Sequence, residues 1–97
     1  MRHIEVVGDA VGEQRLQQAL WMKSTVDKVK RQVPAKSFRH LEYRRRPMVD
    51  AICGEVEVNG AYTRFMASIP KQTLAFDTGD WDFADMWWRV CESLTAR

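Results

Sequence analysis

The sequence lacks the short patterns that identify most enzymes and metal sites. It contains two histidines, His3 and His40, and two cysteines, Cys53 and Cys91, and none of them falls at a C-x-x-C or H-x-x-x-H spacing. A glycine-rich phosphate-binding loop is also missing. Because a lone histidine on a strand is more often structural or solvated than catalytic, we expect a protein that is not an enzyme and that holds neither a metal nor another cofactor.

The chain also lacks long apolar runs, internal repeats and low-complexity stretches. No window approaches the roughly 18 apolar residues that a membrane span requires, and residues 1–7 lack the apolar segment of a signal peptide. We therefore expect a cytoplasmic protein with no membrane partner. Its 97 residues, of which 45% are hydrophobic and 29% charged, are expected to form one globular domain, residues 1–97.

Charge is unevenly distributed, although the net charge is only +2. Residues 1–47 hold eleven Lys or Arg against five Asp or Glu, whereas residues 48–97 hold four against eight. Opposite charge on the two halves would permit a homodimer, arranged either head to tail or about a two-fold axis.

The clearest structural pattern is a β-hairpin centred on Asn59-Gly60, two residues that tolerate the positive φ angles of a type I′ turn. The predicted pairs on one face are Val58 with Ala61, Val56 with Thr63, Gly54 with Phe65, and Ile52 with Ala67. The predicted pairs on the other face are Glu57 with Tyr62, Glu55 with Arg64, Cys53 with Met66, and Ala51 with Ser68. The first face is apolar. On the second face, cross-strand pairing of the two acids is a simpler interpretation than acid–base chemistry.

Helices are predicted before and after this hairpin. Apolar residues recur at helical spacing from about Val11 to Val33, which indicates one helix, or two helices that meet near Lys23, ended by Pro34. A second amphipathic pattern runs from about Asp82 to Leu94. Acidic residues at its start, including Asp80, suit the free N–H groups and the dipole of a helix N-terminus.

Shorter patterns predict further strands. The segment His3 to Val7 indicates a short strand, or else residues 1–10 form a flexible N-terminus. Strands are also expected from Phe38 to Arg45 and from Thr73 to Asp77. The order predicts a single α+β domain with an N-terminal helix, a four-stranded antiparallel meander and a C-terminal helix. We expect both helices to pack on the apolar face of the hairpin.

Several segments resemble a loose group of small uncharacterised bacterial proteins, many of which are exported. The similarity lies in Phe38-Arg39 on a strand, in Cys53-Gly54-Glu55-Val56, in Tyr62 and Arg64-Phe65, and in a C-terminal helix with Trp87, Trp88 and Cys91. It covers roughly residues 26 to 94. The chain departs from the pattern in having Glu57 where Asn is usual, a shorter turn and no export signal. Since the group has no established activity, the resemblance implies a fold and leaves the function open.

The resemblance also implies a disulfide between Cys53 and Cys91, which would join a strand to the C-terminal helix in an oxidising compartment. The alternative is a pair of buried free thiols. Because the chain shows no export signal, we expect the free thiols.

The aromatic residues support the leading hypothesis, a non-catalytic protein-interaction module. Four Trp and five Met exceed what the core of two short helices needs, and exposed aromatic residues commonly anchor protein interfaces. The candidate interface residues are Trp21, Trp81, Trp88, Tyr62 and Arg64. Helical spacing directs Trp88 sideways or outward, whereas Trp87 falls in the buried stripe. Packing of each aromatic residue against a flanking loop is an equal alternative.

A protein partner is therefore expected, and such a chain also fits a phage-encoded or mobile-element accessory factor that blocks a host protein. A second hypothesis is nucleic-acid binding by the basic region from Lys28 to Arg46. The candidate phosphate contacts are Lys28, Arg31, Lys36, Arg39, Arg44, Arg45 and Arg46, with Tyr43 or Trp21 available to stack on unpaired bases. A solvated run of charge is the simpler explanation, since a pI near 8.7 is below that of most dedicated nucleic-acid binders.

Overall fold

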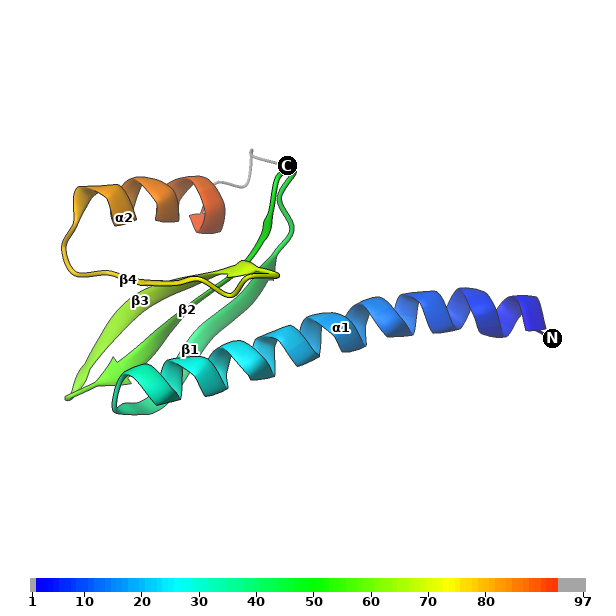
Figure 1. Ribbon diagram of the computed structural model, residues 1–97, viewed down its shortest axis with the longest axis horizontal. Helices are drawn as coiled ribbons and strands as arrows, with labels where there is room; N and C mark the ends of the chain where they lie inside the picture. Colours follow the sequence, from blue (N-terminus) through cyan, green and yellow to red (C-terminus); the bar gives the residue numbers. More distant parts are fainter. Residues whose placement is uncertain (1, 93–97) are drawn as a thin grey trace.

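The computed structural model describes the backbone of residues 2–92 and the side chains of residues 14–92. The elements are a helix, α1 (Arg2–Gln32), four strands, β1 (Ala35–Arg44), β2 (Asp50–Val58), β3 (Ala61–Ile69) and β4 (Leu74–Phe76), and a second helix, α2 (Trp81–Trp87), which continues as a π-helical turn, η1 (Trp88–Glu92). This order confirms the predicted single α+β domain (Figure 1). Among the described residues, no helix combines the length and the hydrophobicity that crossing a membrane would require.

The four strands form one antiparallel sheet in sequence order, and the predicted hairpin is its centre. Strands β2 and β3 pair in an unbroken register over residues 50–58 and 61–69, so all eight predicted pairs are confirmed. Asn59 and Gly60 have φ angles of 53° and 86°, the left-handed values of a type I′ turn. The turn and the hydrophobic alternation therefore specify the same register.

Gly54 in the middle of β2 allows two apolar side chains to meet over the strand. A Cβ atom at Gly54 would lie 2.6 Å from Leu41 Cδ2 and 3.2 Å from the ring of Phe65. The first distance is shorter than real Cβ contacts and the second is unusually tight, so any other residue here would require Leu41 and Phe65 to shift. Phe65, which is fully buried, occupies the space that the missing side chain leaves.

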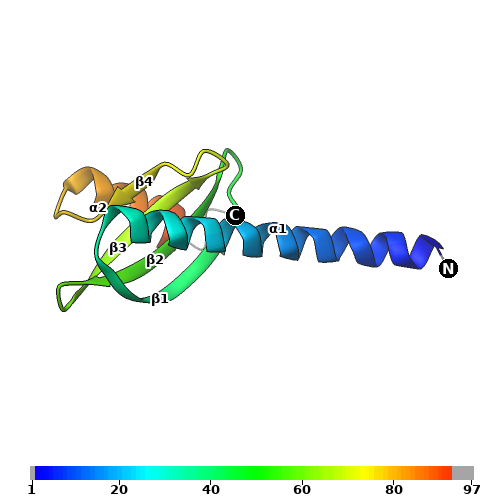
Figure 2. The same cartoon turned by 60° about the horizontal axis from the view of Figure 1, so that its bottom comes forward.

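The two helices cover opposite faces of the sheet (Figures 1 and 2), which corrects the expectation that both pack on one face. Helix α1 packs on the face of Val56 and Phe65 through the fully buried Val29. Helix α2 and η1 pack on the other face, around Cys53 and Met66. Successive side chains of a strand point to opposite faces. Cys53 and Met66, which are paired across β2 and β3, therefore form an apolar area on the second face. The hairpin is thus the middle of three layers.

Helix α1 is one continuous element, not two. Residues 2–10 belong to it, so the strand expected at His3–Val7 is wrong. The apolar residues Ile4, Val7 and Val11 continue the helical spacing towards the N-terminus, and this period outweighs the strand preference of β-branched residues. The second half of α1 lies along the sheet, whereas the first half extends past it (Figure 2).

The turn between β3 and β4 ties α1 to the sheet. Gln72, which has a φ angle of 56°, accepts a hydrogen bond from Ser24 Oγ at 3.1 Å and donates one through Nε2 to Thr25 Oγ1 at 3.2 Å. Lys28 Nζ donates to the Gln72 carbonyl oxygen at 2.7 Å. Since Thr25 is fully buried, Gln72 satisfies a hydroxyl that water does not reach.

Strand β4 itself is shorter than the expected Thr73–Asp77.

Candidate protein-interaction site

The candidate site is built on α2, and Asp80, the residue before this helix, is its N-cap. Asp80 has extended backbone angles, φ −75° and ψ 134°, and its side chain accepts a hydrogen bond from the Asp82 N–H at 3.2 Å. This is the capping role expected for the acidic residues at this point. Phe83 is only 6% exposed and stacks on Trp87, with ring centroids 5.9 Å apart. The cap and the buried ring together fix the start and the direction of α2.

A disulfide between Cys53 of β2 and Cys91 of η1 fixes the other end of this helix. The expectation of two free thiols is therefore wrong, and residues 2–92 contain no free cysteine. The two Cα atoms are 5.9 Å apart, and both residues are buried in a cluster with Met66 and Phe83. The physical reason is the strand register, which places Cys53 on the sheet face that η1 covers. The expectation of free thiols rested on the N-terminal residues, which carry no information about that register.

Two tryptophans on this helix face the solvent. Trp81 is 75% exposed and Trp88 is 59% exposed, as the outward direction predicted for Trp88 requires. Because they are seven residues apart, close to two helical turns, they lie on the same side of the helix at roughly 10 Å spacing. Asp85 lies between them and forms an ion pair with Arg89 at 3.3 Å. We call the surface of Trp81, Asp85, Trp88 and Arg89 the tryptophan face.

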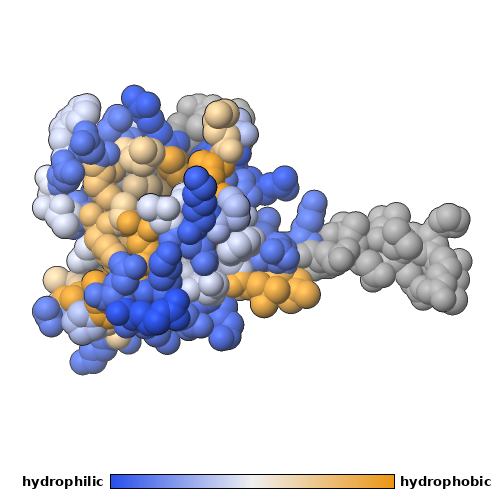
Figure 3. Space-filling model, in the orientation of Figure 1, coloured by the Kyte–Doolittle hydropathy of each residue, from blue (hydrophilic) through white to orange (hydrophobic). Residues whose placement is uncertain are grey.

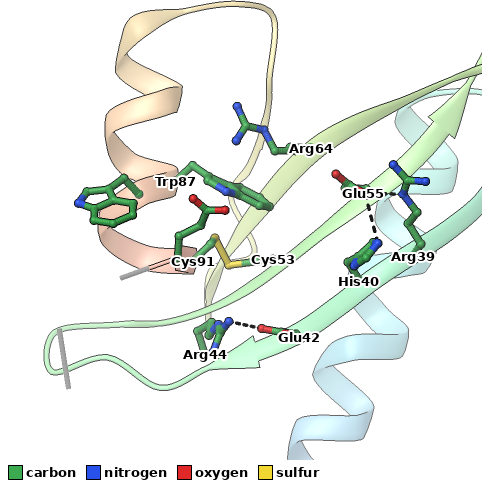
Figure 4. Close-up of a pocket in the computed structure, with 11 residues that line it drawn as sticks. Arg39, His40, Glu42, Arg44, Cys53, Glu55, Arg64, Trp87 and Cys91 are labelled. Atoms are coloured by element: carbon green, nitrogen blue, oxygen red, sulfur yellow. Dashed lines mark hydrogen bonds and ion pairs between the residues drawn. A yellow bond between two sulfur atoms is a disulfide. The ribbon is translucent and has the colours of Figure 1, made fainter. Parts of the chain in front are cut away.

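An open groove of about 630 Å³ lies beside the disulfide, between η1 and the strands (Figure 4). Its guanidinium groups are largely engaged: Arg39 Nε binds Glu55 at 2.5 Å, and Arg44 forms an ion pair with Glu42. His40, on the same rim, is 3.9 Å from Glu55. Among the described residues, no group of three His, Cys, Asp or Glu side chains is placed to hold a metal ion. The groove next to α2 and η1 is therefore lined by charged side chains that already form ion pairs with one another.

Arg64 joins this groove to α2. Its Nε and Nη2 donate to Asp77 Oδ2 at 3.1 and 2.8 Å, and its guanidinium lies 5.0 Å from the centre of the Trp87 ring. The Gly79 backbone N–H and the Arg64 guanidinium hold the pKa of Asp77 below its ordinary value. Although Arg64 is opposite Glu55 in register, the ion pair predicted between them is replaced by pairs with other residues. Arg64 thus supports Trp87 from the sheet side.

The other two candidate interface residues lie elsewhere. Tyr62, nearer the hairpin turn, lies 3.7 Å beneath the Arg39 guanidinium, and its hydroxyl is 2.9 Å from Ser37 Oγ. Trp21 is half-buried on the opposite face of the sheet, against the cluster that contains Ile52. The structure therefore gathers Trp81, Trp88 and Arg64 around α2 and leaves Tyr62 and Trp21 outside this surface.

The basic residues of the nucleic-acid hypothesis do not form one free patch. Lys28, Arg39 and Arg44 are bound to Gln72, Glu55 and Glu42, respectively. Arg31, Lys36 and Arg45 are exposed, and Arg46 Nη1 donates to the Arg45 carbonyl oxygen at 3.2 Å.

The two aromatic residues expected to stack on bases are packed against the sheet. Tyr43 and Trp21 both contact the cluster of Ile52, Ala67 and Ile69. The Tyr43 hydroxyl donates to Asp50 Oδ2 at 2.8 Å, and burial, together with this bond, raises the pKa of Tyr43 to about 12. Both rings are therefore held by contacts within the domain.

The sequence did not indicate the groove, because its walls come from three strands and from η1, which are far apart in the chain. The one sequence feature that indicates the groove is the Cys53–Cys91 pairing that the resemblance implies.

No protein-family model, no curated protein and no solved structure matches this chain, so the functional argument rests on the geometry of this surface.

Proposed function

We propose that the protein is a non-catalytic protein-interaction module that binds its partner through the tryptophan face. The observation that carries this proposal is the exposure of Trp81 and Trp88, 75% and 59%, on a helix anchored at both ends. Tryptophan is enriched among the residues that dominate binding energy at interfaces. Burying most of such a ring contributes roughly 3 kcal/mol at about 25 cal/mol per Å².

Anchoring of the helix favours tight binding. The Asp80 cap, the buried Phe83 and the Cys53–Cys91 disulfide hold α2 and η1 in place before any partner arrives. A preorganised surface loses little conformational entropy on association. The exposed rings therefore behave as rigid anchors.

The charges around the tryptophan face suggest the chemistry of the partner. Asp82, next to Trp81 in the chain, and Glu92, one turn after Trp88, are exposed acids, whereas Asp85 is paired with Arg89. An apolar pocket bordered by basic residues would complement this surface, and mutual attraction would steer the encounter.

The disulfide supports an oxidising compartment as the place of action, in contrast to the cytoplasm expected from the sequence. The role of a phage or mobile-element factor that blocks a host protein stays a prediction, and the proposed binding surface does not depend on it.

The test is affinity capture with immobilised wild type and with two matched variants. In the first variant, Trp81 and Trp88 are replaced by alanine. In the control, Met48→Ala removes another apolar side chain, which is 94% exposed on the loop between β1 and β2. A protein that wild type and control capture, but the tryptophan variant does not, is then purified and its affinity measured by calorimetry.

We expect the double replacement to weaken binding at least a hundredfold, with an unchanged melting temperature, because neither ring supports the core. Equal affinity of all three proteins would remove the tryptophan face as the site. A third variant with Arg44, Arg45 and Arg46 replaced by alanine tests the nucleic-acid alternative, which predicts salt-sensitive capture of nucleic acid that this variant loses.

A further inference from the structure

Helix α1 is much longer than the part of it that contacts the sheet. Its 31 residues correspond to about 46 Å of helix. Among its described side chains, which belong to residues 14–32, the fully buried ones are Thr25 and Val29. Residues 2–20, roughly 28 Å of helix, extend beyond the sheet (Figures 1 and 2). Since an isolated helix of this length is only marginally stable in water, packing against another surface would stabilise it.

The protruding part carries an exposed apolar patch. Leu16 is 59% exposed and Leu20 is 52% exposed, and their spacing of four residues places them one turn apart on the same side. Figure 3 shows apolar colour on this part of the helix, next to the grey residues. The side chains nearby, Gln14, Arg15 and Gln17, are polar and exposed. The patch is therefore a narrow apolar stripe suited to another helix rather than to a broad surface.

Charges of opposite sign lie on either side of this stripe. At about 100° per residue, Glu5, Asp9 and Glu13 occupy helical positions in line with the two leucines on their N-terminal side, and Lys23, Lys30 and Arg31 occupy such positions on their C-terminal side. Two residues on the line are exceptions, Arg2 and Asp27. Asp27 pairs with Lys23 of its own helix at 3.4 Å. Three of the four charges before the leucines are thus acidic, and three of the four charges after them are basic.

We propose that this stripe binds the same stripe of a second copy of the chain, with the two α1 helices antiparallel about a two-fold axis between Leu16 and Leu20. Leu16 of one copy then faces Leu20 of the other, and Glu13 of one copy faces Lys23 of the other. A parallel pair would instead align like charges along the whole helix, which disfavours it. The antiparallel pair is isologous and closed, so it ends at two copies.

The dimer and the tryptophan face are independent of each other. The stripe is on α1 and the tryptophan face is on α2, and the sheet lies between these two helices. Failure of the dimer test would therefore leave the proposed binding of a partner protein intact, and the reverse also holds.

Sedimentation equilibrium of the full chain tests the proposal. Wild type is expected to be a dimer, and Leu16→Gln combined with Leu20→Gln is expected to be a monomer at every concentration measured. Glutamine has a helix propensity close to that of leucine, so this change removes the apolar contact and keeps the helix. Circular dichroism checks that the fold is retained.

Charge reversal tests the antiparallel arrangement. Glu13→Lys and Lys23→Glu should each weaken the dimer roughly tenfold, because each creates two repulsive contacts about the axis. An equimolar mixture of these two variants should regain wild-type association, since both contacts then join opposite charges. Arg15→Glu, an exposed reversal on the same helix but off the line, is the control and should have no effect.

A monomeric wild type would overturn the proposal. A dimer that persists in the double glutamine variant would also overturn it, since another surface would then hold the two copies together. Association of the mixture no stronger than that of either single variant would refute the antiparallel pairing.

Discussion

Replacing Cys53 and Cys91 together with alanine is expected to destabilise the domain by about 4 kcal/mol. The two residues are 38 positions apart, and closing a loop of that length lowers the entropy of the unfolded chain by roughly 13 cal/mol/K, or about 4 kcal/mol at 25 °C. Both side chains are buried, so lost packing of the sulfur atoms adds a smaller cost. For a domain of this size, the melting temperature should fall by roughly 15–30 °C.

The assay is urea denaturation of wild type and of the alanine variant, each with and without a reductant. Reductant should lower the midpoint of wild type and leave that of the variant unchanged, and native wild type should resist thiol alkylation in mass spectrometry. A variant that loses less than about 1 kcal/mol would refute the reasoning, because the loop constraint would then contribute little. A wild type that alkylates at both thiols without reductant would refute the bond itself.

Three further changes test the sheet and its contacts. Gly54→Ala should lower the free energy of unfolding by about 1–3 kcal/mol in urea denaturation, because the new Cβ would lie 2.6 Å from Leu41 Cδ2. Leu41→Ala in the same chain should recover part of this loss. An unchanged midpoint for Gly54→Ala would contradict the close packing. Gln72→Ala should lower the free energy of unfolding by about 1–3 kcal/mol, because it leaves the Thr25 hydroxyl unpaired. The loss should be smaller in a chain that already carries Thr25→Val. Additive losses would show that the two side chains do not interact. Absorbance titration should show Tyr43 ionising near pH 12, and stability should fall between about pH 10 and 12, because the unfolded chain releases this proton first. Tyr43→Phe should remove that fall, and a Tyr43 ionisation near pH 10 would contradict the buried hydrogen bond.

The hairpin could be predicted residue by residue because two independent constraints agree there. Asn59-Gly60 sets the loop, and the alternation of apolar residues sets which side chains share a face. The second helix was predictable for the same reason, since its apolar period and its acidic start indicate the same first turn.

The sides on which the helices pack were not predictable in this way. Both faces of the hairpin carry apolar area, one around Phe65 and one around Cys53 and Met66, so the pattern does not say which helix covers which face. The ion pairs were missed because they depend on the chain beyond the sheet: Asp77, just after β4, captures Arg64. The exposed tryptophans of the candidate site were partly foreseen, but their arrangement depends on the disulfide.

The edges of the sheet explain how a small open sheet avoids aggregation. Strand β1, one of the two edge strands, has shifts of register on both sides of its centre, and His40 within it has a φ angle of 57°. Irregular, charged edges are poor templates for strand pairing between molecules. The opposite edge, β4, is only three residues long. Neither edge offers the long flat template on which fibrils grow, so this chain is expected not to form fibrils at the concentrations needed for the proposed pairing of α1 helices.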